Sequence, residues 1–112
     1  MNASVAILRP SHILSSTSGG ELLEQINHHL QAGKKAILID FSDAMFMDST
    51  GLGYLVTALS RIKAAQGELY LCSLKGQAAM LIELTKMDKT FQIFADRAAF
   101  DLYHSARNTS ES

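Results

Sequence analysis

The feature of this sequence that most constrains its fold is a pair of short apolar segments separated by a long amphipathic one. Residues 36–41 (AILIDF) are rich in branched side chains and too few for a helix, so they predict a buried strand. Residues 50–65 carry apolar side chains at helical spacing, and residues 68–73 (ELYLCS) predict a second strand. Strands joined by such a helix run parallel, because parallel neighbours need a crossover of a dozen or more residues. The sequence therefore predicts an α/β fold.

Upstream of this unit, the sequence predicts one strand and one helix. Residues 4–10 predict a strand that ends at Pro10, because proline lacks the N–H that would continue a ladder. A loop rich in Ser, Thr and Gly follows. We expect Thr17 or Ser18 to cap a helix that extends to about Ala32.

Downstream of the unit, residues 77–86 predict a third helix, with Leu81, Leu84 and Met80 directed toward the core. Residues 91–94 then predict a last short strand.

The C-terminal part of the sequence predicts a fourth helix and a tail. Asp96 is placed to cap a helix that extends to about Ser105, and the polar residues from about Arg107 predict a frayed end. With no interior linker or repeat in the sequence, we expect residues 1–112 to form a single domain.

Composition argues against several classes of function. The 10 basic and 11 acidic residues are scattered along the 112-residue chain, which gives no electrostatic reason to expect nucleic acid or an anionic membrane as partner. No segment approaches the ~20 apolar residues of a membrane span, so we expect no membrane insertion. The single Cys72 and the absence of a secretory signal pattern predict a cytoplasmic protein. The four His residues lack ligand spacing, so we expect neither a metal nor a cofactor.

The segment most suggestive of function joins the buried strand to the long helix. Asp48, Ser49 and Thr50 fall at or beside the start of that helix, where the first N–H groups lack intrahelical partners and the macrodipole is positive. A phosphate on Ser49 would fit there without disrupting the helix. It would also add about −1.5 to −2 charges beside Asp48, which would change the surface seen by a partner. The same residues are also ordinary capping chemistry, and both interpretations stay open.

The residues around this segment are candidates for a docking surface. If the preceding segment is extended, alternation places Met45 and Met47 on one side, where they line the surface, and Phe46 on the other, in the core. Gly51 and Gly53 offer a backbone that a partner can approach closely.

Two separated motifs resemble the STAS domain of bacterial anti-sigma factor antagonists. The first is the apolar strand and short link followed by DSTGLG over residues 48–53, which is similar to the family's Asp-Ser-Ser/Thr-Gly-Leu-Gly at the start of a helix. The second is IELTKMDKTF over residues 82–91, which is similar to the family's hydrophobic-Glu-Leu-Thr-x-hydrophobic-Asp-x-x-Phe segment. The resemblance covers roughly residues 36–100. It implies a STAS-like single layer of about four strands, mixed or mostly parallel, packed with about four helices.

The resemblance also implies a function as a binding module and kinase substrate, not as an enzyme. In the family the Ser that follows the Asp, here Ser49, is phosphorylated by a serine kinase of the histidine-kinase-like ATPase type that is also the anti-sigma factor. The unmodified antagonist sequesters this kinase, phosphorylation releases it, and a PP2C-type phosphatase restores the antagonist. The residues carried over to partner binding are those of the junction: Asp48, Ser49, Thr50, Gly51, Met45 and Met47.

Several alternatives stay open at this stage. Thr50 neighbours Ser49 and is the second candidate for phosphorylation. The segment SHILS over residues 11–15 departs from the family's Gly-x-Leu-Asp-like turn, which leaves the partner's identity open. Other functions compatible with the resemblance are a STAS-like regulatory subunit of a transport system, which binds its partner constitutively, and a sensor of a small ligand or nucleotide.

Overall fold

Strand β3 (Ala36–Asp40) lies at the centre of the structure. The structure is a computed structural model that describes residues 5–111, and its side chains are described up to Ala106. All five of its residues are buried, as expected for a strand with apolar layers on both faces. The remaining elements, in chain order, are β1 (Val5–Leu8), β2 (His12–Leu14), α1 (Ser16–Gln31), β4 (Ala44–Met47), α2 (Ser49–Ala64), β5 (Glu68–Cys72), α3 (Gly76–Leu84), the 3₁₀ turn η1 (Met87–Lys89), β6 (Gln92–Phe94) and α4 (Arg97–Glu111).

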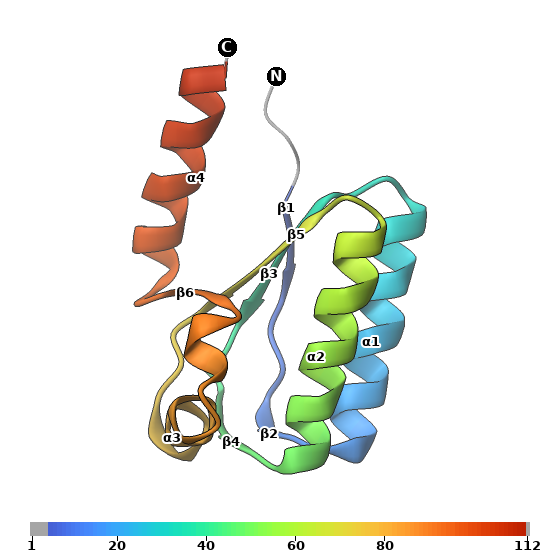
Figure 1. The fold of residues 1–112 in the computed structure, drawn as a ribbon, viewed down its shortest axis with the longest axis vertical. Coiled ribbons are helices and arrows are strands. Elements are labelled where there is room, and N and C mark those ends of the chain that lie inside the picture. Colours follow the sequence, from blue (N-terminus) through green and yellow to red (C-terminus); the bar gives the residue numbers. More distant parts are fainter. Residues whose placement is uncertain (1–4, 112) are drawn as a thin grey trace.

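The main sheet has the order β1-β3-β5-β6, and each neighbouring pair is parallel. Helices α1 and α2 lie side by side on one face of this sheet and α4 lies on the other (Figure 1). A second, two-stranded sheet pairs β2 with β4, also in parallel. The fold class predicted from the sequence, a mostly parallel α/β layer with four main strands and four helices, is confirmed.

The two faces of the main sheet form two separate apolar cores. Ile37 and Ile39 of β3 pack with the apolar residues of α1 and α2, among them Leu55 and Ile62. Leu38 points to the opposite face, where it joins an aromatic group that includes Tyr70 and Phe100. Because side chains alternate along a strand, one strand contributes to both cores.

Helix α1 begins slightly earlier than expected. Its N-cap is Ser15, not Thr17 or Ser18, and the backbone N–H of Ser15 donates to the hydroxyl of Ser18 at 2.9 Å. That hydroxyl in turn donates to the carbonyl of Ile13 at 2.8 Å. Ser18 therefore reaches back to stabilise the helix start in a capping box.

Helix α3 is turned differently from the orientation predicted. Met80 and Leu84 are 54% and 76% exposed, so their predicted inward direction is wrong, and the fully buried positions are Ala78 and Ile82. The side chain of Gln77 fixes this orientation, because its Oε1 accepts from the N–H of Met47 in β4 at 2.8 Å. No local periodicity could have indicated this contact.

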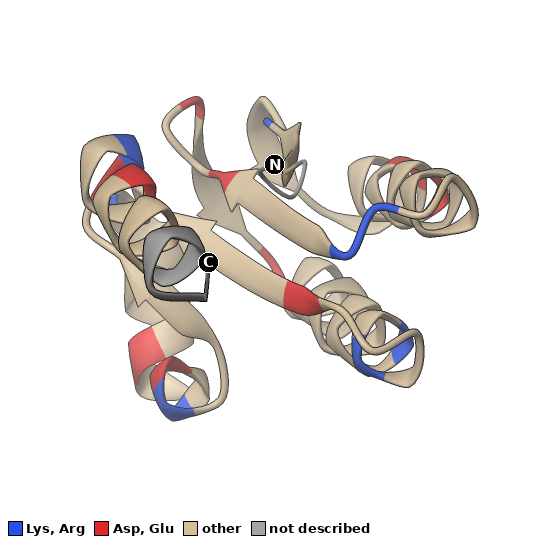
Figure 2. Cartoon of the chain, turned by 90° about the horizontal axis from the view of Figure 1, so that it is seen from above, with Lys and Arg blue, Asp and Glu red and all other residues tan. Residues whose placement is uncertain are grey.

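The last helix is longer than predicted. The sequence pattern places its end at about Ser105, whereas the backbone of α4 is helical up to Glu111. The described part of the chain has no helix of sufficient length and apolarity to cross a bilayer. Within that same part, Lys and Arg residues occur on several separate elements, as Figure 2 shows, in keeping with the scattered charge of the sequence.

Candidate functional site

Ser49 is the first residue of α2, and it is exposed together with its neighbours Asp48 and Thr50. Asp48 is the N-cap residue, with an extended backbone (φ −102°, ψ 178°), and its Oδ1 accepts from the N–H of Gly51 at 2.7 Å. The carbonyl of Asp48 accepts from the N–H of Leu52 at 3.0 Å. The sequence prediction that Ser49 stands at a helix N-terminus agrees with this geometry.

The electrostatics at this point follow from the cap. The carboxylate of Asp48 accepts from the N–H of Gly51. The N–H groups of Ser49 and Thr50 lie in the first turn of α2, where N–H groups have no acceptor within the helix. These N–H groups, together with the helix dipole, give the start of α2 a positive potential that favours an anionic group. The site can therefore accept negative charge on Ser49, but in competition with the carboxylate of Asp48.

Gly51 is buried, in contrast to Ser49 and Thr50. A Cβ at this position would overlap the carbonyl oxygen of Leu14 at the end of β2. The same carbonyl accepts from the N–H of Asp48 at 3.2 Å, so β2 lies directly against the start of α2. The absence of a side chain at Gly51 therefore serves an internal contact, and the buried Gly51 itself presents little surface to a partner. Gly53 is exposed, with open space where a Cβ would stand.

The burial along β4 does not follow the alternation expected from the sequence. Met45 and Phe46 are 45% and 48% exposed, whereas Met47 is 2% exposed and packs in the core. The expected core position of Phe46 and the expected surface position of Met47 are therefore both wrong. The pairing of β2 with β4 shifts register between His12 and Ile13, and such an irregularity lets adjacent side chains point to the same side.

Three large apolar side chains of the small sheet are exposed at this end of the molecule, Ile13, Met45 and Phe46, and we call them the β2–β4 patch. Ile13 is 39% exposed and is the register partner of Phe46. β2, β4 and the start of α2 lie together at the lower end of the molecule in Figure 1. Large apolar side chains exposed side by side are a common mark of a protein interaction site.

Sequence reasoning missed three residues of this region. Ile13 lies in a segment whose polar composition predicts a loop, and Phe46 has a sequence pattern that predicts burial. Gln77 supports β4 from a helix 30 positions away in the chain, as its hydrogen bond to Met47 shows. Only the prediction that residues 44–47 form a strand exposed to solvent would have placed Phe46 on the surface.

A second cluster lies at the carboxyl ends of β3 and β5. Asp40 is 2% exposed, its Oδ1 accepts from the N–H of Ser42 at 2.9 Å, and its Oδ2 lies 3.6 Å from Nε of Arg9. Burial raises the pKa of the Cys72 thiol, which favours the neutral form of this side chain. No group of three or more potential metal ligands occurs among the residues that the structure describes.

Comparisons with known proteins identify the family of this chain. The family model of the STAS domain matches residues 2–99. BtrV of Bordetella bronchiseptica, described as a candidate anti-sigma factor antagonist, is 22% identical over 87 residues, which cover 78% of this chain and 75% of BtrV. The anti-sigma-B factor antagonist of Staphylococcus aureus is 32% identical over 65 residues, which cover 58% of this chain and 60% of that protein.

Solved structures show the same fold. The crystal structure of a candidate anti-sigma factor antagonist from Thermotoga maritima superposes with a TM-score of 0.81 at 24% identity, covering 90% of this chain and 87% of the other. The anti-sigma factor antagonist SpoIIAA in its unphosphorylated form superposes with a TM-score of 0.70 at 15% identity, covering 95% and 93%. SpoIIAA of Bacillus in its phosphorylated form gives 0.68 at 16% identity, covering 92% and 94%. With a family match over most of its length and this fold, the chain belongs to the STAS domain family.

Proposed function

We propose that this protein is an anti-sigma factor antagonist that works by partner switching, with Ser49 as the phosphorylated residue. The observation that carries this proposal is the position of Ser49, which is exposed at the first turn of α2 and only three residues from the exposed Phe46. The relatives named above as anti-sigma factor antagonists support the same role.

In its unmodified form, the protein binds an anti-sigma factor that is also a serine kinase of the histidine-kinase-like ATPase type. The contact surface combines the β2–β4 patch with Asp48, Ser49 and Thr50. The patch provides apolar area that a partner can bury, and the polar residues of the helix start form its border. This arrangement of an apolar centre and a polar rim is typical of protein interfaces.

Phosphorylation of Ser49 acts on this surface and not on the core. A phosphoserine carries about −1.5 to −2 charges at neutral pH, and its oxygens would stand beside the Asp48 carboxylate. The positive end of the α2 dipole favours this charge, so the helix keeps its start. A partner docked on the patch would meet added bulk and like charge next to Asp48, and it would dissociate.

Removal of the phosphate restores the binding surface. We assign this step to a PP2C-type phosphatase, with ATP and divalent metal belonging to the partner enzymes. The antagonist itself supplies the hydroxyl, the helix start and the docking patch. We place the cycle in the cytoplasm, where sigma factors act.

The modification site is tested directly by incubating the full chain with a histidine-kinase-like serine kinase and ATP, and mapping the phosphate by mass spectrometry. We expect phosphate on Ser49 and its loss in Ser49→Ala. Thr50→Ala is the matched control, since it removes the neighbouring hydroxyl and should leave phosphorylation intact. Phosphate that persists in Ser49→Ala and disappears in Thr50→Ala would move the site to Thr50.

A second experiment separates partner switching from the constitutive binding expected of a transport-system subunit. A pull-down with Ser49→Asp should lose the partner that the unmodified protein captures. Retention of that partner with the same yield would favour the constitutive role, in which Ser49 is only a contact or a capping residue.

A further inference from the structure

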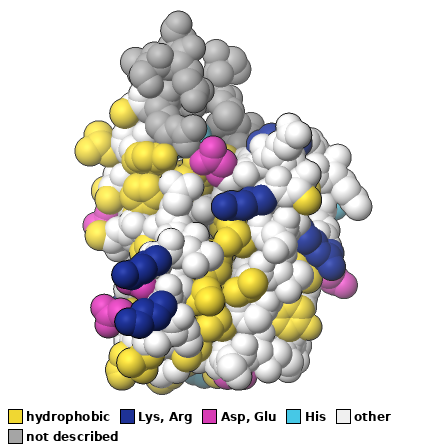
Figure 3. All heavy atoms as spheres, viewed as in Figure 1, with side chains coloured by type: hydrophobic (Ala, Val, Ile, Leu, Met, Phe, Trp, Pro, Cys, Tyr) yellow, Lys and Arg dark blue, Asp and Glu magenta, His cyan; other side chains and the backbone are white. Residues whose placement is uncertain are grey.

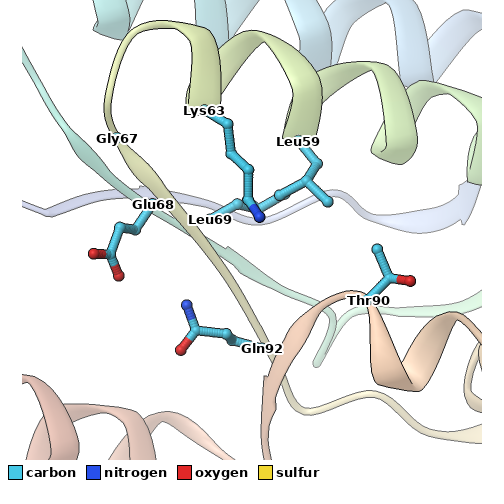
Figure 4. Close-up of a pocket in the computed structure, with 7 residues that line it drawn as sticks. All are labelled: Leu59, Lys63, Gly67, Glu68, Leu69, Thr90 and Gln92. Atoms are coloured by element: carbon cyan, nitrogen blue, oxygen red, sulfur yellow. The ribbon is translucent and has the colours of Figure 1, made fainter.

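A cavity of about 410 Å³ lies between the C-terminal half of α2 and the β5–β6 edge of the main sheet. It is lined by Leu59, Lys63, Gly67, Glu68, Leu69, Thr90 and Gln92 (Figure 4). Its volume falls within the range of about 300–1,000 Å³ that is common for small-molecule sites. None of these residues belongs to the docking surface described above.

The inner wall of the cavity is apolar and held in place by the fold. Leu69 is 2% exposed, and the partly buried Leu59 packs against the same core. At the upper end, the N–H of Gly67 donates to the carbonyl of Ile62 at 2.8 Å. A Cβ at Gly67 would overlap the carbonyl of Lys35, so this close turn requires glycine. The wall is therefore preformed.

The polar lining of the cavity is rich in hydrogen-bond donors. Figure 4 shows Lys63 extending from α2 toward β5, with Gln92 and Thr90 on the opposite side. An ammonium, a carboxamide and a hydroxyl together can donate to several acceptor atoms. Among the residues described, no acidic side chain lies within ion-pair distance of Lys63.

The remaining polar residue is already engaged on its own strand. Glu68 accepts a hydrogen bond from the hydroxyl of Tyr70 at 2.6 Å. Figure 3 shows that hydrophobic side chains continue down this face of the molecule beside basic ones. A ligand that matches such a lining has an anionic acceptor group at one end and an apolar body.

We propose that this cavity binds a small carboxylic acid with an aliphatic or aromatic body. Its carboxylate pairs with the ammonium of Lys63, and its apolar part packs on the partly buried Leu59, beside the nearly inaccessible Leu69. Lys63 is fourteen residues from Ser49 on the same helix, which corresponds to about 21 Å at 1.5 Å per residue. The ligand and a docked protein partner can thus occupy the molecule together, and this site does not depend on the role proposed for Ser49.

The experiment is a titration of the isotope-labelled full chain with hexanoate, followed by amide chemical shifts. We expect saturable shifts confined to residues 59–69 and 90–92. Two probes dissect the recognition: hexan-1-ol has the apolar body without the charge, and acetate has the charge without the body. Both should bind at least about tenfold more weakly than hexanoate, because each lacks one of the two interactions.

Variants then test the assigned cation. Lys63→Met keeps the aliphatic stem and removes the charge, and it should weaken hexanoate binding about tenfold, whereas Lys63→Arg should retain it. Arg61→Met is the matched control, since Arg61 is exposed on the same helix but does not line the cavity. The proposal is overturned by shifts that do not saturate in the millimolar range or that map elsewhere. It is equally overturned by equal binding of hexan-1-ol, or by unchanged affinity in Lys63→Met.

Discussion

In the main sheet, β3 buries all five of its residues, whereas β4 in the small β2–β4 sheet buries only its first and last. Both strands are rich in apolar side chains, but β3 lies between two apolar cores, whereas the middle of β4 faces solvent. The two adjacent exposed residues of β4, Met45 and Phe46, contribute to a surface instead of a core. The main sheet therefore carries the buried core of this fold, whereas the small sheet next to Ser49 presents the exposed apolar side chains that we propose as the contact surface.

The largest effect on stability is expected in the main sheet. Ile39→Ala removes a fully buried side chain from β3 and should lower the free energy of unfolding by about 2–5 kcal/mol in chemical denaturation. Ile7→Ala on edge strand β1 is the control, since Ile7 is 42% exposed and its loss should cost less. Equal losses at the two positions would break the contrast between core and periphery.

The next effect tests where the small sheet meets α2. Gly51→Ala places a Cβ against the carbonyl of Leu14, and it should cost about 1–3 kcal/mol because the backbone must shift. Gly53→Ala in the same helix meets open space, and it should be neutral or stabilising by about 0.5–1 kcal/mol. Thermal or chemical denaturation measures both. A harmless Gly51→Ala would show that β2 is not held against the helix start.

A smaller effect is expected for the N-cap of α2. Asp48→Ala removes the acceptor of the Gly51 N–H and should lower the free energy of unfolding by about 1 kcal/mol. Asp48→Asn keeps an acceptor oxygen in the same place, so it should restore most of this loss. If Asn restores nothing, the charge of Asp48 and not its capping bond supports the helix.

The smallest effect on stability is expected at the docking surface. Phe46→Ala should change the free energy of unfolding by no more than about 0.5 kcal/mol, since the side chain is 48% exposed. The same change should weaken binding of the anti-sigma partner by about 2 kcal/mol, or roughly thirtyfold, as expected for an aromatic anchor. Calorimetric titration with that partner measures the second quantity. Unchanged affinity would remove Phe46 from the interface.

The central strand β3 and helix α2 could be predicted from the sequence, because each has enough residues to show its pattern. The run at residues 36–41 and the helical spacing after Thr50 are local properties, and both elements form where the pattern places them. The start of α2 at Ser49 was predictable for the same reason, because capping residues precede the apolar positions.

The small sheet could not be predicted in the same way. β2 and β4 are three and four residues long, and their register is irregular at His12, which has a positive φ of 71°. The burial of Met47 and the exposure of Phe46 depend on this pairing and on the distant Gln77. These are tertiary contacts, and a periodicity read along the chain contains no information about them.

The most direct test compares the unmodified protein with the protein phosphorylated on Ser49 in two measurements, thermal unfolding and calorimetric titration with the anti-sigma partner. The account predicts that phosphorylation weakens binding by at least about tenfold while the unfolding temperature stays nearly unchanged, because the added charge lies on the docking surface at a favourable helix end. Unchanged affinity, or weaker binding that accompanies loss of the folded structure, would contradict it.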